Sequence, residues 1–139
     1  MSRTTQALAA TALAVIVIVS IAGTAYAQSG IARLGHRWDV EHSNGWKGIW
    51  TRRDIRGAIS NQYDAVWFHP VHGEFRSDIR IHISVRDELI IQRKDITGLQ
   101  AGKTCRYTGR LNFAARTARG TSTCVFAPGN HPWWAKIWR

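Results

Sequence analysis

The sequence predicts an all-β protein: a small antiparallel up-and-down barrel, or a sandwich, of seven or eight strands. Three observations support this prediction. Several segments alternate apolar and polar residues with a period of two, turn-forming residues recur between them at short spacing, and no amphipathic helical pattern follows the N-terminal apolar segment. Short turns favour a meander, and closure into a barrel is favoured because it removes exposed strand edges.

The N-terminus has the pattern of a secretory signal peptide. Arg3 is followed by an apolar segment, residues 7–22, and then by Ala-Tyr-Ala ending at Ala27, whose small residues suit a signal peptidase. We therefore expect residues 1–27 to be removed as a helical signal peptide. The protein would then be exported, periplasmic or extracellular, with no transmembrane span after cleavage. The alternative is that the apolar segment is retained as an anchor helix, because it approaches the roughly 20 residues that span a bilayer.

The remainder of the chain is expected to be one domain. Residues 28–37 have weak apolar periodicity and predict a mobile N-terminal arm, and residues 38–139 predict a single β-barrel domain. A domain of this size has a core with little surplus stability, so a covalent crosslink is expected to help it.

The domain is strongly basic. The chain has 19 basic and nine acidic residues, a net charge of +10, and Arg3 is the only charged residue before position 28. This balance favours an anionic partner such as an acidic envelope glycan, a lipid or an acidic protein. Nucleic acid would also suit this charge but is a less expected partner, and the oligomeric state is left open. A basic surface with no dedicated partner is the simpler alternative.

Residues 44–53 predict a first barrel strand. Trp46, Gly48 and Trp50 share one parity and are expected to face inward, whereas Lys47 and Arg53 lie on the outward parity. The alternation over residues 38–42 permits a short strand before it.

The other segments with strand patterns follow in order. The clearest is residues 78–85, in which Ile79, Ile81, Ile83 and Val85 alternate with polar residues. The others are residues 62–69, 88–94, 104–113, 117–126 and 133–139. Phe113 is expected to face inward. We expect turns at residues 72–74 and 86–87, a loop at 96–102, and a break in the sheet at 128–132, where two prolines occur.

Two cysteines in an exported chain predict a disulfide. If Cys105 and Cys124 lie directly opposite each other, the hairpin is centred between Ala114 and Ala115, with both cysteines facing inward. A wider loop would offset the pair. The alternative is a redox-active role, which the absence of a Cys-x-x-Cys spacing does not favour.

Several motifs resemble known barrels. Gly48-Ile49-Trp50 resembles the Gly-x-Trp signature of lipocalins, and the spacing Trp-x-Gly-x-Trp resembles the start of avidin-type barrels. The wider set Gly-Trp-Lys-Gly-Ile-Trp-Thr-Arg-Arg, Tyr-Asp-Ala-Val-Trp, Cys-Arg-Tyr-Thr-Gly-Arg-Leu, Gly-Thr-Ser-Thr-Cys and Trp-Trp-Ala-Lys-Ile is similar to small exported bacterial proteins of uncharacterised function. This resemblance covers most of residues 38–137 and implies a barrel and export, but no activity. The chain is short for a full lipocalin calyx, so a large cavity is not expected.

One cluster has the composition of a metal site. His69, His72 and Glu74 lie within six residues, and two imidazoles with a carboxylate could hold zinc or copper. The alternative is a turn whose imidazoles hydrogen-bond to the backbone. The other histidines are scattered, so a small secreted hydrolase is the least favoured function, and no cofactor is expected.

The remaining candidates are cationic and aromatic residues of the strands and of one connection. Arginines cluster near residue 53, others share the outward parity of the cysteine hairpin and predict one stripe, and two tryptophans flank Lys136 on the last strand. The candidate ligand-binding residues are Arg52, Arg53, Arg56, Arg106, Arg110, Arg119, Trp134 and Trp138. Arginine suits anionic groups and an exposed indole can stack on a sugar ring.

These patterns predict an exported, non-enzymatic β-barrel module that binds an anionic or apolar envelope ligand. The alternative is a periplasmic protein-interaction or enzyme-inhibitor barrel. The two predictions differ in the partner rather than in the fold.

Overall fold

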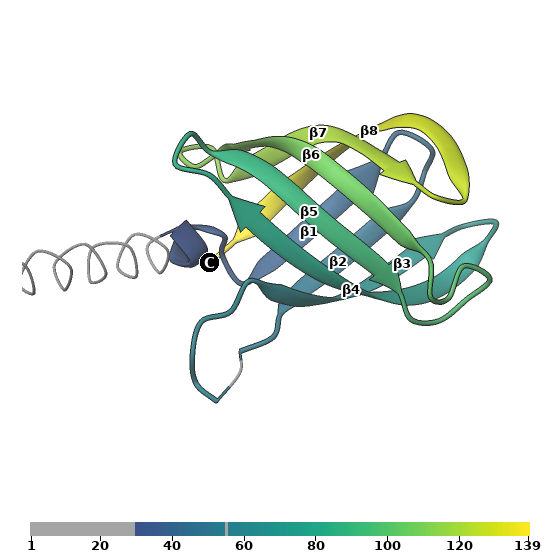
Figure 1. The fold of residues 1–139 in the computed structure, drawn as a ribbon, viewed down its shortest axis with the longest axis horizontal. Coiled ribbons are helices and arrows are strands. Elements are labelled where there is room, and N and C mark those ends of the chain that lie inside the picture. Colours follow the sequence, from purple (N-terminus) through teal and green to yellow (C-terminus); the bar gives the residue numbers. More distant parts are fainter. Residues whose placement is uncertain (1–29, 55) are drawn as a thin grey trace, which may run out of the picture.

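The computed structural model describes residues 30–54 and 56–139, which form a closed antiparallel β-barrel (Figure 1). Each strand pairs with its neighbours in sequence, and β1 pairs with β8 to close the sheet. The strands are β1 (Arg37–His42), β2 (Lys47–Arg52), β3 (Gln62–His69), β4 (Gly73–Ile83), β5 (Glu88–Asp95), β6 (Thr104–Asn112), β7 (Thr117–Cys124) and β8 (Ala127–Trp138). The predicted up-and-down barrel is confirmed, and the sandwich is not formed.

The predicted signal peptide, residues 1–27, lies outside the described residues. Over the part of the chain that the structure describes, no helix is both long and apolar enough to cross a membrane. Export and signal cleavage therefore stay predictions.

Large aromatic side chains fill the barrel interior. The indoles of Trp38, Trp50, Trp67 and Trp133 are each at most 1% exposed, and strand alternation directs them inward. Trp50 stacks on Trp38 with ring centroids 5.8 Å apart. Gly48 makes this packing possible, because a Cβ there would lie 2.8 Å from the indole ring of Trp67. The inward parity predicted for Trp50 is confirmed, while Trp46 is half-buried at one end of the barrel.

The cysteine hairpin forms with the predicted register. Cys105 lies directly opposite Cys124, Gly109 lies opposite Gly120, and a disulfide joins the two cysteines. The turn spans residues 113–116, which is wider than a two-residue turn, yet the cysteine pair is not offset.

The strand at residues 44–53 is the second strand of the barrel, which corrects the prediction that it is the first. The preceding short strand, β1, is essential to closure, because Trp38 lies opposite Trp50 on β2 and opposite Ile137 on β8. A local pattern could not reveal this, because the β8 partner is distant in sequence.

Strand β4 differs from its predicted bounds at both ends. It begins at Gly73, so the turn lies at residues 70–72 rather than at 72–74, and β4 pairs with β3 from His69↔Gly73 onward. At its other end the strand stops at Ile83, and Val85 is 79% exposed in the following turn. Phe113 is likewise 41% exposed in a turn. The period of two therefore continued in the sequence past the ends of the strands.

The predicted break at residues 128–132 is wrong, because β8 runs through both prolines. Pro132 pairs with Thr121 of β7, and its carbonyl accepts a hydrogen bond from the backbone N–H of Ser43 just after β1 ends. The missing N–H of Pro132 points to the same side as this carbonyl, where the β1 ladder has already ended, so little pairing is lost. A register shift between Ser122 and Cys124 accommodates the rest of the segment.

The predicted mobile N-terminal arm is also corrected. Residues 30–33 form a helical turn beside the C-terminus at one end of the barrel (Figure 1), and Leu34 is completely buried. The indole Nε1 of Trp38 donates to the carbonyl of Leu34 at 2.6 Å, and the hydroxyl of Tyr63 donates to the carbonyl of Gly35 at 2.7 Å. We call the end of the barrel that residues 30–35 cover the closed end. The opposite end, bordered by the β1–β2, β3–β4, β5–β6 and β7–β8 connections, is the open end.

Candidate functional site

The outer face of β4–β8 carries a row of uncharged side chains that crosses the strands. Cross-strand register places each member directly opposite the next along the row. The members are His82, Ile90, Thr108, Thr121 and Pro132. They line a groove of about 1040 Å³ on the outside of the barrel. We call this row the trough floor.

Arginines flank the trough floor on both sides. On β6, Arg106 and Arg110 lie two residues on either side of Thr108, and Arg110 is directly opposite Arg119 of β7. Arg80 is in register with Arg106 across Gln92 of β5. Because residues on one strand rise by about 3.3 Å each, the two lines of arginines stand about 13 Å apart.

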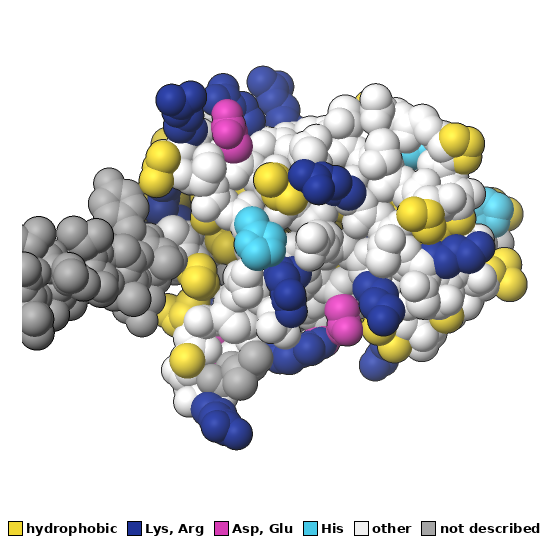
Figure 2. Space-filling view, in the orientation of Figure 1, with side chains coloured by type: hydrophobic (Ala, Val, Ile, Leu, Met, Phe, Trp, Pro, Cys, Tyr) yellow, Lys and Arg dark blue, Asp and Glu magenta, His cyan; other side chains and the backbone are white. Residues whose placement is uncertain are grey.

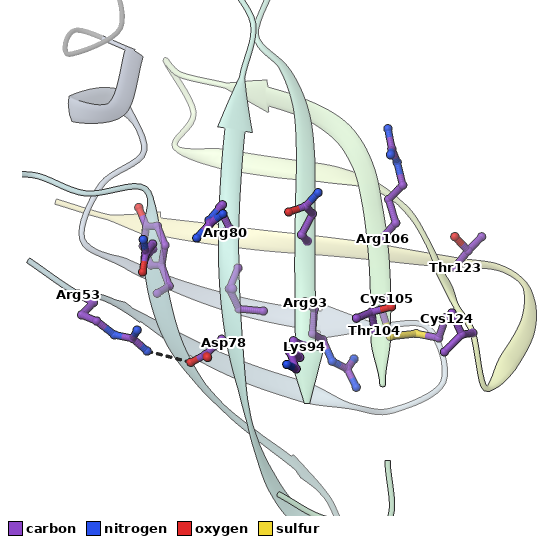
Figure 3. Close-up of a pocket in the computed structure, with 15 residues that line it drawn as sticks. Arg53, Asp78, Arg80, Arg93, Lys94, Thr104, Cys105, Arg106, Thr123 and Cys124 are labelled. Atoms are coloured by element: carbon purple, nitrogen blue, oxygen red, sulfur yellow. Dashed lines mark hydrogen bonds and ion pairs between the residues drawn. A yellow bond between two sulfur atoms is a disulfide. The ribbon is translucent and has the colours of Figure 1, made fainter. Parts of the chain in front are cut away.

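We call the floor and its four flanking arginines, Arg80, Arg106, Arg110 and Arg119, the basic trough. Arg80 and Arg106 also border a second groove of about 730 Å³, which crosses β3–β7 (Figure 3). The two grooves share one continuous outward surface, because their lining residues occupy successive positions on the same strands.

Three of the four flanking arginines have no acidic partner. Among the described residues, Arg80, Arg106 and Arg119 form no ion pair, and Arg110 lies 3.8 Å from Glu88. Figure 2 shows that Lys and Arg side chains predominate over Asp and Glu on this face. The predicted stripe of arginines thus comes together on the outside of β6 and β7, and β4 adds Arg80. Such a surface has a positive potential that attracts anions.

The predicted cluster near residue 53 is arranged differently. Arg52 pairs with Asp54 at 2.8 Å, and Arg53 bridges Asp64 and Asp78, the latter at 2.8 Å (Figure 3). The hydrogen bond to Asp64, followed by that to Asp78, raises the pKa of Arg53 further above its ordinary value. Arg56 is exposed in the β2–β3 connection with a positive φ of 52°. The first two arginines are therefore engaged within the chain, outside the basic trough.

The two outward tryptophans of β8 lie in different environments. Trp134 is 47% exposed and stands between Arg119 of β7 and Glu41 of β1, so it borders the basic trough. Trp138 is 42% exposed, its Nε1 donates to Asp39 at 2.8 Å, and Lys136 lies over its ring at 4.2 Å. Trp134 is thus the indole with a free edge beside the arginines.

The predicted metal ligands form an aromatic cluster. His69 Nδ1 accepts hydrogen bonds from the backbone N–H groups of Val71 and His72, at 3.1 and 3.4 Å. The imidazoles of His69 and His72 lie 4.5 Å apart, and Trp46 stacks on His72. Within residues 30–54 and 56–139, no three His, Cys, Asp or Glu side chains group closely enough to hold a metal ion. The hydrogen bonds of His69 match the alternative of a turn in which an imidazole bonds to the backbone, and Glu74 does not complete a three-ligand group among the described residues.

The inside of the open end carries a polar constellation that the sequence interpretation missed. Arg93 forms a bidentate ion pair with Asp95 at 2.6 and 2.8 Å, and its Nη1 donates to the hydroxyl of Tyr107 at 3.0 Å. The guanidinium carbon also lies 4.9 Å from the ring centroid of Trp67. The signal was present in the sequence, because Arg93 and Asp95 share the inward parity of Leu89 and Ile91 on β5.

His42 extends this constellation on β1. Its imidazole packs edge-on against Trp67 and Tyr107, with ring centroids 5.1 and 5.3 Å away. Burial, followed by the positive charge of Arg93 and the proximity of His131, lowers the pKa of His42 to about 4. His42 is therefore neutral at neutral pH. Burial also raises the pKa of Tyr107, so its hydroxyl stays protonated.

No protein-family model matches the chain, and no curated protein is significantly similar to it. Its resemblance to lipocalins, avidin-type barrels and small exported proteins therefore stays a prediction.

Proposed function

We propose that the protein is an exported, non-enzymatic β-barrel that binds an acidic polysaccharide of the cell envelope along the basic trough. The observation that carries the proposal is the pair of arginine lines on either side of an uncharged floor, with three of the four arginines in no ion pair among the described residues. The predicted anionic ligand is thereby narrowed to one class, an acidic polysaccharide.

The geometry favours a chain lying in the trough. Guanidinium groups bind carboxylates bidentately, so arginines on both sides can hold acidic groups that project from either side of a polymer. Thr108 and Thr121 on the floor offer hydroxyls to sugar hydroxyls, and the exposed ring of Trp134 at the edge can stack on a sugar face. The uncharged floor lets the polymer backbone approach closely.

The same geometry argues against a lipid surface as the partner. The floor contains two threonines and a histidine, and Ile90 is its one large aliphatic side chain, 40% exposed. A membrane-docking face buries a broad apolar area instead.

The test is isothermal titration of the purified protein with polygalacturonate, with dextran as the uncharged polymer. We expect binding to polygalacturonate that weakens steeply as salt is added, because contacts between exposed charges are screened. Dextran is expected not to bind. Equal binding to both polymers, or an affinity that does not change with salt, would contradict the proposal.

Two double variants locate the binding surface. Arg106→Gln with Arg119→Gln removes one cation from each side of the trough and should weaken binding about tenfold, since exposed charge pairs contribute up to about 1 kcal/mol each. Arg56→Gln with Arg116→Gln removes the same charge from two exposed connections and should have little effect. Equal losses from both pairs would indicate a general charge effect rather than a site.

The alternative is a protein-interaction or enzyme-inhibitor barrel, which the exposed indoles of Trp134 and Trp138 favour. An acidic protein partner would use the same arginines. This alternative is indicated if polygalacturonate does not bind at any salt concentration while a partner protein copurifies with the wild type and is lost on Trp134→Ala.

A further inference from the structure

The open end of the barrel holds a cavity that is separate from the basic trough. Its volume is about 320 Å³, at the lower end of the roughly 300–1,000 Å³ of small-molecule sites. Aromatic side chains of Trp46, Phe75 and Phe126 form part of its wall. The basic trough lies on the outside of β4–β8, whereas this cavity is lined by inward side chains and by the connections of the open end.

Three side chains that line the cavity carry buried polar atoms without hydrogen-bond partners among the described residues. His42 Nε2, His131 Nε2 and Gln100 Oε1 are buried, and the described residues offer none of them a hydrogen bond. His42 is only 7% exposed, so bulk water does not satisfy its ring. Buried polar groups are nearly always hydrogen-bonded, so three such atoms on the side chains around one cavity favour an occupant with hydrogen-bonding groups.

The cavity carries little uncompensated charge. Arg93 is neutralised by Asp95, which is 1% exposed, and shares a further hydrogen bond with Tyr107. His42 is neutral at neutral pH, for the reason given above. Glu74 is exposed and stands at the rim rather than inside. A charged ligand would lose its hydration and find no free opposite charge inside.

We propose that the open end binds a small, uncharged ring compound that carries hydroxyl or N–H groups. Gln100 Oε1 accepts a hydrogen bond from such a group, and the free nitrogens of His42 and His131 bind further polar atoms of the ligand. The ring packs among Trp46, Phe75 and Phe126. This site does not depend on polysaccharide binding, and the two can be tested separately.

The test compares the binding of three ring compounds of similar size. Binding is measured by the ¹⁵N chemical shifts of the histidine side chains and by tryptophan fluorescence. Catechol is uncharged and has two hydroxyls, toluene has none, and benzoate is anionic. We expect catechol to bind at least about tenfold more tightly than either analogue, because a site built for hydrogen bonds rejects ligands that leave it unsatisfied. We also expect catechol to shift the ¹⁵N resonances of His42 and His131 and to leave His82, on the outer face, unchanged.

Matched variants identify the residues. Gln100→Leu keeps the side-chain size and removes the acceptor, whereas Gln92→Leu makes the same change on the outer face of β5. Only Gln100→Leu should weaken catechol binding. His42→Phe should also weaken catechol binding. Gln100 lies in an exposed connection, so Gln100→Leu is expected to fold even if His42→Phe does not.

Several outcomes would overturn the proposal. Toluene binding as tightly as catechol would show an apolar pocket, and tighter binding of benzoate would show an anion site. No ¹⁵N shift with any of the three compounds at millimolar concentration would show a cavity filled by water only. An unchanged affinity in both Gln100→Leu and His42→Phe would place binding elsewhere.

Discussion

The two ends of the barrel are built from the same strands but are filled in opposite ways. At the closed end, Trp38 and Tyr63 donate hydrogen bonds to the carbonyls of Leu34 and Gly35, and Leu34 is completely buried. At the open end, His42 is also buried, yet its Nε2 has no partner, and a cavity of about 320 Å³ remains. Alternation directs side chains inward at both ends, but among the described residues a segment of the chain covers the closed end and accepts hydrogen bonds there, whereas His42 Nε2 at the open end has no such partner.

Strand pattern alone does not decide whether the interior of a barrel is completely filled. The aromatic side chains of Trp38, Trp50 and Trp67 fill one part by packing against each other, with Trp67 Nε1 donating to Ser77 at 2.8 Å. Beyond them, Arg93 and Asp95 take inward positions on β5. The side chains of this ion pair fill less volume than two indoles would. Stability should therefore rest on the aromatic part, and pH sensitivity and ligand binding on the open end.

The largest expected effect is in the aromatic part. Trp50→Ala should lower the free energy of unfolding by about 3 to 5 kcal/mol, because it leaves a cavity among fully buried rings. Denaturant titration measures it, with Arg53→Ala as the control. Arg53 is partly exposed, so its pairs with Asp64 and Asp78 should contribute about 1 kcal/mol or less each. Similar losses in both variants would contradict the filled interior.

The next effect is at the ion pair of the open end. Asp95→Asn should lower the free energy of unfolding by about 3 kcal/mol, because it leaves the buried charge of Arg93 without its counterion. Replacing both residues, Arg93→Met with Asp95→Leu, should recover much of this loss in the same denaturant titration. A loss well below 1 kcal/mol in Asp95→Asn would mean that water reaches Arg93 and that the open end is wetter than the structure indicates.

The smallest effect is the dependence of stability on pH through His42. Its pKa is about 6.5 in the unfolded chain and about 4 in the folded one, so the unfolded state binds more protons between these values. The stability that His42 contributes is present above about pH 6.5 and is lost as the pH falls toward about 4, which amounts to about 2 to 3 kcal/mol between about pH 7.5 and about pH 4.5. Unfolding at about pH 7.5 and about pH 4.5 measures it.

His42→Phe is the control for this pH effect, because carboxylates also titrate near the lower value. The difference in stability between the two pH values should be smaller in His42→Phe than in the wild type. An identical pH dependence would show that the imidazole is solvated in the folded protein.

Much of the fold could be predicted because it depends on local pattern. The alternation of Ile79 and Ile81, the inward parity of Trp50, and the pairing of Cys105 with Cys124 all follow from a period of two along single strands or one hairpin. The errors occur where the pattern outlasts the strand, as at Val85, or where a ladder has already ended, as at Pro132.

The candidate sites were less predictable because they combine distant strands. Parity placed Arg106, Arg110 and Arg119 outward, but only the registers of β4 through β8 bring them together with Arg80 and Trp134. The sequence likewise offered Arg52 and Arg53 as candidate binding cations, because a strand pattern does not show that they pair with Asp54, Asp64 and Asp78.

Local pattern accounts for the position of most strands, for most of the side chains that they turn inward, and for the crosslink, because each depends on neighbours along one chain segment. Tertiary structure decided that β1 closes on β8, that Leu34 and Gly35 complete one end, and that His42 and His131 meet Arg93 at the other. The physical reason is that burial and hydrogen-bond satisfaction depend on what lies across the barrel, and those partners come from residues far apart in the sequence.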